Sequence, residues 1–221
     1  MINLNFWDYN DVAAGYFAAA AIAARDPKVG IITLEVARPD FPVADRGSFA
    51  DSDLKAAAKG FYTIRDFAPG PRHGYVIVQG SSSTVNLVNQ LPKLEEAGVN
   101  VKVISAISEE LFDRQPESYR NSVLPPEAFY DLMVVSTGTR RVWPVRGVGP
   151  LTDAYSLTSD WDNQWLTGGL EQEVIAEAHL DPASVFAGIQ RFAGDRAERL
   201  ALQREMLGAL STSQDGGSNV P

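Results

Sequence analysis

The stretch YVIVQGSSSTVNLVNQLPKLEEAGVNVKVI, residues 75–104, decides the fold of this chain. Its first five residues are an apolar, β-branched run that is typical of a buried strand. The turn Gly80–Thr84 follows, then an amphipathic helix to Glu96, with Gly98 as its stop. Val99–Ile104 is a second buried strand, so the stretch predicts one right-handed βαβ unit.

The same alternation continues towards the C-terminus. It predicts a helix from about Ser108, strands over 129–136 and around 154–158, and a final helix over 182–192. We therefore predict the α/β class, with three layers around a mostly parallel sheet, for a domain of residues 74–193. Residues 194–221 are predicted as a charged helix over 195–210 followed by a Ser/Gly/Asn-rich, disordered tail.

Upstream of this domain, residues 1–73 predict a partial α/β segment and a linker. An alanine-rich helix over 12–25 follows the polar caps Asp8 and Asn10, and Val29–Val36 reads as a buried strand. Phe61–Arg65 is a further candidate strand before the turn-rich connection 68–72. We place the domain boundary after residue 73.

Composition restricts the function classes. The 221 residues are 45% apolar and include no cysteine, which excludes thiolate metal sites and favours a reducing compartment. No run approaches the roughly 20 apolar residues of a membrane span. A formal charge of −9 disfavours binding to nucleic acid. We expect a cytoplasmic protein with neither a membrane nor a nucleic acid as partner.

Three groups of residues could carry chemistry, but each has a simpler explanation. The hydroxyls of Gly80–Thr84 stand where an anion could bind, yet this turn lacks the lysine of a P-loop and is better explained as capping its helix. His73 and His179 have no partner at ligand spacing and are predicted to be structural. An irregular acidic cluster beside Trp161 and Trp165 could hold a metal but better suits a solvated surface: Asp160, Asp162, Glu171, Glu173 and Glu177.

Arg38 is the strongest single candidate. It follows the end of the predicted strand Val29–Val36, where α/β proteins present ligand-binding groups. Its guanidinium could hold a phosphate or carboxylate through two parallel hydrogen bonds. The alternative is an ordinary loop arginine that pairs with Asp40 or Asp45, and position alone does not separate the two.

Three stretches together resemble the C-terminal domain of transketolases. They are Gly80–Val88, then Leu94–Ser105, then ELFDRQPESYRNSVLP over residues 110–125, where the family typically shows "ELFDxQPxxYRxSVLP". We predict that the third stretch forms two helical turns broken by Pro116, anchored on the sheet by Phe112, Tyr119 and Val123. Further on, Ser159–Trp165 replaces the glycine-rich stretch that the family usually has there.

The resemblance also covers residues 8–46, which look like the end of the pyrimidine-binding domain that precedes the C-terminal domain in this family. There Ala37–Pro42 is similar to a motif whose arginine contacts the substrate phosphate, and this implies that role for Arg38. Transketolases use thiamine diphosphate and Mg²⁺, held through a "GDG" motif that is absent from this sequence. We therefore expect neither a cofactor nor catalytic residues in this chain alone.

Two functions remain open on this basis. The first is the C-terminal portion, or a split component, of a transketolase-like enzyme that transfers two-carbon ketol units between sugars. Its partner would be a second copy or a cofactor-binding transketolase subunit. The second is a stand-alone, non-catalytic module for association or small-ligand binding. Another thiamine enzyme, such as a homodimeric pyruvate dehydrogenase component, fits the stretch 110–125 less well.

Overall fold

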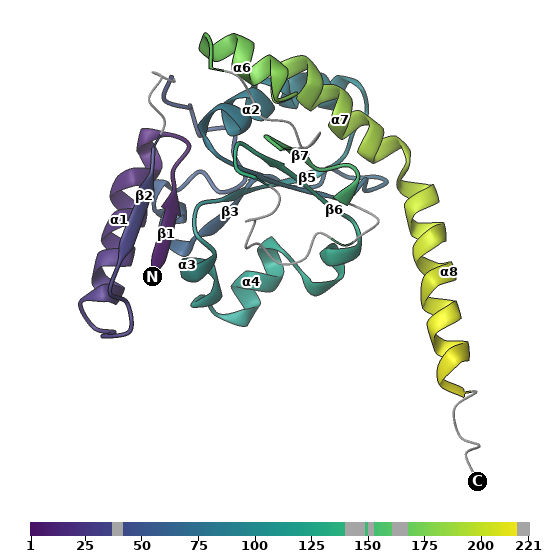
Figure 1. Ribbon diagram of the computed structural model, residues 1–221, viewed down its shortest axis with the longest axis horizontal. Helices are drawn as coiled ribbons and strands as arrows, with labels where there is room; N and C mark the ends of the chain where they lie inside the picture. Colours follow the sequence, from purple (N-terminus) through teal and green to yellow (C-terminus); the bar gives the residue numbers. More distant parts are fainter. Residues whose placement is uncertain (37–41, 140–148, 150–152, 161–167, 216–221) are drawn as a thin grey trace.

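The computed structural model describes residues 1–36, 42–139, 149, 153–160 and 168–215, with side chains to Gly208 in the last helix. A five-stranded sheet forms its centre, in the order β3-β5-β4-β6-β7 (Figure 1). Only β3 runs antiparallel to its neighbour, and the other pairs are parallel. The strands are β3 Phe61–Arg65, β4 Tyr75–Gln79, β5 Lys102–Ala106, β6 Leu132–Ser136 and β7 Leu157–Thr158. The predicted α/β class with a mostly parallel sheet is confirmed.

The predicted βαβ unit is present. Helix α2, Ser81–Glu96, connects β4 to its parallel neighbour β5. Gly98, with a φ of 70°, turns the chain after the helix in a conformation that glycine adopts without strain. The later helices α6, Glu171–Glu177, and α7, Pro182–Gly194, lie with α2 on one face of the sheet (Figure 1).

Strand alternation divides the core between the two faces of the sheet. Val76, Val78 and Val103 belong to a large cluster that includes α2 and α7, whereas Ile77 and Ile104 belong to a smaller cluster on the opposite face. Because successive side chains point to opposite faces, strands covered on both faces carry apolar residues at consecutive positions, as in Val76–Val78 and Val103–Ile104.

The segment after β5 covers the smaller cluster. It forms α3, Glu109–Asp113, and α4, Glu117–Val123, separated at Pro116 as predicted. The ring of Phe112 stacks on that of Phe61 with 4.5 Å between centroids, and the Tyr119 hydroxyl donates to the Phe61 carbonyl at 2.8 Å. Val123 is buried in the same cluster. The predicted anchors are therefore confirmed.

Residues 1–36 form a second, smaller sheet. Strand β1, Ile2–Asn5, pairs in parallel with β2, Ile32–Glu35, and helix α1, Tyr9–Ala23, connects them. The sequence analysis missed β1, since four residues with two asparagines carry little strand signal. Its prediction of a buried strand over 29–36 was wrong: β2 is shorter, and Leu34 is 44% exposed because β1, not β2, packs against α3.

The central sheet begins before the predicted boundary at residue 74. β3 was assigned to the preceding segment, but it pairs with β5 from Phe61 to Arg65. The short helix η1, Leu54–Lys59, leads into it and packs against α1. Beyond this strand, the division of the chain into domains stays a prediction.

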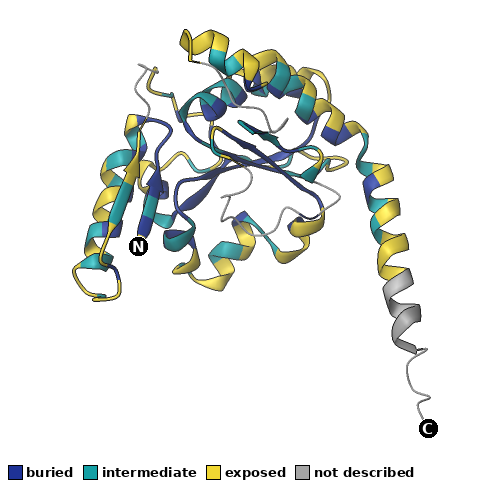
Figure 2. Cartoon of the chain, in the orientation of Figure 1, coloured by how far each residue is buried: buried dark blue, intermediate teal, exposed yellow. Residues whose placement is uncertain are grey.

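The C-terminal segment is more ordered than expected. Helix α8, Arg196–Asp215, projects from the body of the protein and is largely exposed (Figures 1 and 2). The prediction of disorder from residue 211 was therefore wrong for 211–215, while 216–221 lie outside the described residues. Asp131 anchors the start of α8 through Arg196 at 2.5 Å and Arg199 at 2.8 Å. Within the described ranges, no helix is both long and apolar enough to cross a bilayer.

Candidate functional site

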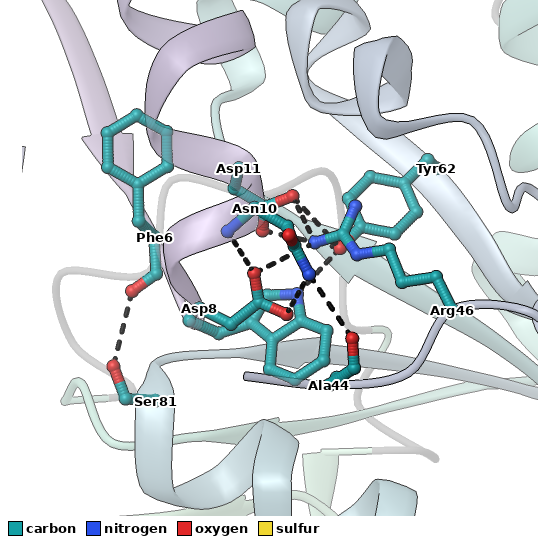
Figure 3. A network of polar contacts seen from close by, with 9 residues as sticks. Phe6, Asp8, Asn10, Asp11, Ala44, Arg46, Tyr62 and Ser81 are labelled. Atoms are coloured by element: carbon teal, nitrogen blue, oxygen red, sulfur yellow. Dashed lines mark hydrogen bonds and ion pairs between the residues drawn. The ribbon is translucent and has the colours of Figure 1, made fainter. Parts of the chain in front are cut away.

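A buried polar network joins the small N-terminal sheet to the central sheet (Figure 3). Asp8 caps α1 by accepting from the backbone N–H of Asn10, and Asp11 lies in the first turn of the same helix. Arg46 arrives from the loop before η1, and Tyr62 from β3. The four ionisable side chains of the network, Asp8, Asp11, Arg46 and Tyr62, are all buried.

The contacts within the network are short. A single Arg46 nitrogen, Nη2, donates to Asp11 at 2.5 Å and to Asp8 at 3.2 Å. The Tyr62 hydroxyl accepts from the Trp7 indole at 2.6 Å and donates towards Asp11 at 3.3 Å. The Arg46 guanidinium also lies over the ring of Tyr62, at 5.1 Å from its centroid. Each charged group therefore faces a partner rather than solvent.

Burial dominates the electrostatics of the network. It raises the pKa of Asp11 to about 7, and the attraction of Arg46 offsets only part of this effect. Burial and the nearby Asp11 charge also raise the pKa of Tyr62. Near neutral pH the Asp11 carboxyl thus exchanges between a charged form paired with Arg46 and a neutral form.

This arrangement can bind and release a proton, but it contains no activated nucleophile. Arg46 bonds to both aspartates through Nη2 alone, while its Nε and Nη1 are buried without a hydrogen-bond partner among the described residues. The clearest role of the network is to connect α1 to β3. The sequence analysis recognised Asp8 as a helix cap and missed Asp11, Arg46 and Tyr62 as a unit. The available signal was Asp11, a charge placed at the start of an otherwise apolar helix.

The carboxyl end of β4, where α/β proteins often bind ligands, is occupied by the chain itself. Gly80 adopts a φ of 90°, and a Cβ added there would lie 2.0 Å from Thr137 Oγ1. The Ser81 hydroxyl donates to the Phe6 carbonyl at 3.2 Å, which brings the loop after β1 against the start of α2. The Ser81 hydroxyl at this turn is thus already engaged by the protein itself.

The hydroxyls of this turn do not cap the helix in the predicted way. Ser83 donates to the carbonyls of Gln79 and Gly80, and Thr84 donates to that of Gly80 at 2.6 Å. Helix α2 has no side-chain acceptor at its N-cap, because Gly80 occupies that position. The hydroxyls therefore satisfy carbonyls at the end of β4 rather than N–H groups of the helix.

The other predicted candidates are distributed as follows. His73 Nδ1 accepts from the backbone N–H of Asn100 at 2.9 Å, which is a structural contact. Of the acidic cluster, Asp162 lies outside the described residues, as do Trp161 and Trp165; among those described, no group of three candidate ligands could hold a metal ion. Glu35 accepts from Asn3 and Asn5 across the small sheet. Arg38 also lies outside the described residues.

Comparison with known proteins identifies the central part of the chain. A profile described as the transketolase-like TK C-terminal domain matches residues 60–150. A transketolase of Aquifex aeolicus is 31% identical over 123 residues, which cover 56% of this chain and 17% of that protein. A chloroplastic transketolase of Solanum tuberosum is 28% identical over 112 residues, covering 51% and 14%.

The fold agrees with this match. The structure of a transketolase from Leishmania mexicana superposes on 88% of this chain and 25% of that chain, with a TM-score of 0.63 at 18% identity. A transketolase mutant from Pichia stipitis gives a TM-score of 0.61 over 87% of this chain. The chain thus spans about a quarter or less of these proteins, and its residues 60–150 match the C-terminal domain of the transketolase family.

Proposed function

We propose that this chain acts as the C-terminal part of a transketolase-like enzyme, which transfers two-carbon ketol units between sugars with the help of thiamine diphosphate. The observation that carries the proposal is the match of residues 60–150 to the C-terminal domain of that family. The fold supports it, since 88% of the chain superposes on one quarter of a transketolase.

The residues of this chain do not fit the cofactor. The sequence has no "GDG" motif, and in the part of the chain that is described no three acidic or histidine side chains are placed to hold a metal ion. Under this proposal, thiamine diphosphate and Mg²⁺ are bound by other polypeptide segments. The present chain contributes structure and, through Arg38, a contact to the phosphate of the substrate. The cytoplasmic location likewise stays a prediction.

An uncovered apolar surface on α1 supports the need for a partner. We define the α1 outer face as its exposed residues Tyr9, Ala13, Tyr16, Phe17 and Ala21. Phe17 is 70% exposed and Tyr16 is 42% exposed. The helix has no charged residue between Val12 and Ala24. A helix that is apolar all round is normally covered by protein.

Reconstitution tests the proposed function. The chain would be mixed with a second polypeptide that carries the diphosphate-binding domain and the first part of the pyrimidine-binding domain. We expect a stable complex with ketol-transferase activity, and no activity from either piece alone. Failure of the two pieces to associate, or thiamine diphosphate binding by this chain alone in calorimetry, would refute the proposal.

A further inference from the structure

A cavity of about 260 Å³ lies on the α4 side of the central sheet. Its walls are mostly apolar and aromatic, and most of them come from the stretch 112–126, part of the segment that was predicted to anchor on the sheet. The lining residues used below are Phe112, Phe129, Leu124, Arg120, Asn121 and Glu117. Sites for drug-sized ligands hold about 300–1,000 Å³, so this cavity suits a smaller molecule.

Arg120 is the distinctive residue of this cavity. Within the described ranges, four arginines have side-chain nitrogens that are shut off from solvent and lack a hydrogen-bond partner. Arg46 and Arg199 nevertheless pair with carboxylates, and Arg65 donates to a backbone carbonyl. For the Arg120 side chain, no hydrogen bond, ion pair or aromatic contact is found among the described residues.

The Nε of Arg120 is a buried donor without a partner among the described residues. A buried donor that stays unpaired is destabilising, and such exceptions need an explanation. Glu117 lines the same cavity and lies three residues before Arg120 on α4, yet no ion pair joins the two side chains. The guanidinium is therefore available to an external anion.

The neighbouring groups define the chemistry of that anion. Phe112, Phe129 and Leu124 offer an apolar wall, and the Asn121 amide can donate or accept a hydrogen bond. The Glu117 carboxylate at the same cavity disfavours a doubly charged group such as a phosphate monoester. A single carboxylate satisfies Arg120 with the least repulsion, because it can accept two parallel hydrogen bonds from a guanidinium.

We infer that this cavity is a binding site for a small carboxylate with an apolar body, held by Arg120 through an ion pair and by the aromatic walls through packing. The site lies on the opposite face of the sheet from α2 and α7 (Figure 1). It requires neither the transketolase activity nor the partner proposed above.

Nuclear magnetic resonance on the full chain tests the inference with benzoate as the probe. The reporters are the Nε–H signal of Arg120 and the backbone amide of Asn121. We expect saturable shifts with benzoate, weaker binding of phenyl phosphate, and none of neutral benzyl alcohol. The absence of a saturable benzoate shift at concentrations up to about 10 mM, or an equal response to benzyl alcohol, would overturn the inference.

Three variants complete the test. Arg120→Met should weaken benzoate binding by about tenfold or more, whereas Glu117→Gln should tighten it by about threefold, because a repulsive charge is removed. Arg114→Met is the matched control: Arg114 lies just after α3, pairs with Asp26 and does not line the cavity, so binding should be unchanged. Two outcomes would contradict the inference. The first is that Arg120→Met keeps the wild-type thermal midpoint and still binds benzoate as tightly as wild type. The second applies if that variant fails to fold, and it is unchanged benzoate binding by Glu117→Gln.

Discussion

The Tyr62 hydroxyl on β3 lies 3.3 Å from both carboxylate oxygens of Asp11 on α1. Asp11 lies on the helix that connects the two strands of the small sheet, Tyr62 lies in the central sheet, and the same carboxylate also accepts from Arg46 at 2.5 Å. A change in the protonation of the Asp11 carboxyl therefore changes the contacts that connect α1 to β3.

Stability should decrease as the pH rises through the range in which Asp11 ionises in the folded state. Burial raises the pKa of Asp11 from 3.8 to about 7, so the folded protein binds this proton more tightly than the unfolded chain does. The resulting stabilisation is complete below pH 3.8 and is lost as the pH approaches and passes about 7. We expect the free energy of unfolding to fall by a few kcal/mol, on the order of 2–4, over that range.

Urea unfolding at several pH values between 5 and 8 would measure this slope. Asp11→Asn cannot ionise and should remove most of it. Glu96→Gln changes an exposed carboxylate on α2 and serves as the control. This variant should keep the wild-type dependence of the unfolding free energy on pH. A slope of the same size in Asp11→Asn and in wild type would exclude Asp11 as its source.

Gly80→Ala should be much more destabilising than Gly98→Ala. Both glycines have positive φ values, 90° and 70°, so an alanine is strained at either position. Only at Gly80 would the new Cβ also meet an atom, Thr137 Oγ1 at 2.0 Å; at Gly98 no described atom lies within 4 Å. We expect a loss of about 1–2 kcal/mol for Gly98→Ala and more than about 3 kcal/mol for Gly80→Ala.

The double variant Gly80→Ala, Thr137→Gly separates the two effects. Removing the Thr137 side chain should recover part of the stability lost by Gly80→Ala, because the clash disappears while the backbone strain remains. Chemical unfolding of the four proteins measures this coupling. Strict additivity of the two changes would show that Thr137 is not the obstacle.

The isolated chain should self-associate through the α1 outer face. Phe17 is 70% exposed there, and no charge on α1 between Val12 and Ala24 opposes contact with another apolar surface. In sedimentation at tens of micromolar, we expect wild type to form dimers or larger soluble species and Phe17→Glu to shift towards the monomer. Leu202→Glu, an exposed apolar position on α8, is the control and should behave as wild type. A wild type that is monomeric throughout would contradict the expectation.

Arg38→Ala should affect phosphorylated substrates selectively in the reconstituted enzyme. A guanidinium that holds the phosphate end of a sugar contributes to binding rather than to the chemical step, so KM should rise while kcat changes little. We expect kcat/KM to fall roughly ten- to hundredfold for phosphorylated acceptors.

Unphosphorylated acceptors provide the internal comparison for Arg38→Ala, and Arg25→Ala, an exposed arginine after α1, provides the matched variant. With unphosphorylated acceptors, kcat/KM of Arg38→Ala should stay near the wild-type value. Arg25→Ala should keep the wild-type kcat/KM with both classes of acceptor. If Arg38 only pairs with a neighbouring aspartate, the variant should treat both substrate classes alike and change stability by less than about 1 kcal/mol.

The periodic parts of the fold could be predicted from the sequence, but contacts between distant segments could not. β4, α2 and β5 follow from apolar runs and a helical pattern within thirty residues. Pairing of β3 with β5 is a non-local contact that no local pattern encodes. β2 has the β-branched composition of a buried strand, but its exposure depends on which strand of the small sheet packs against the rest of the protein, and this is set by tertiary structure.

The same distinction applies to the candidate sites. Sequence position pointed to Arg38 and to the turn at Gly80, because ligands often lie at strand ends. The network of Asp11, Arg46 and Tyr62 spans fifty-one residues, so only the folded chain brings it together. Arg120 was not singled out within the stretch 110–125, since a sequence cannot show that a charge has no partner.

The hydrogen bonds between the N-terminal segment and the central sheet have a practical consequence for the design of a shortened protein. The Asn5 N–H donates to the Ile107 carbonyl at 2.8 Å, and Ser81 is bonded to Phe6, yet the transketolase profile begins only at residue 60. A protein shortened to the profile would lack the hydrogen-bond partners of the Ile107 carbonyl, the Ser81 hydroxyl and the Tyr62 hydroxyl. These three groups would then be exposed to solvent. The stretch that the profile matches is thus shorter than the length that should be expressed to obtain a stable product.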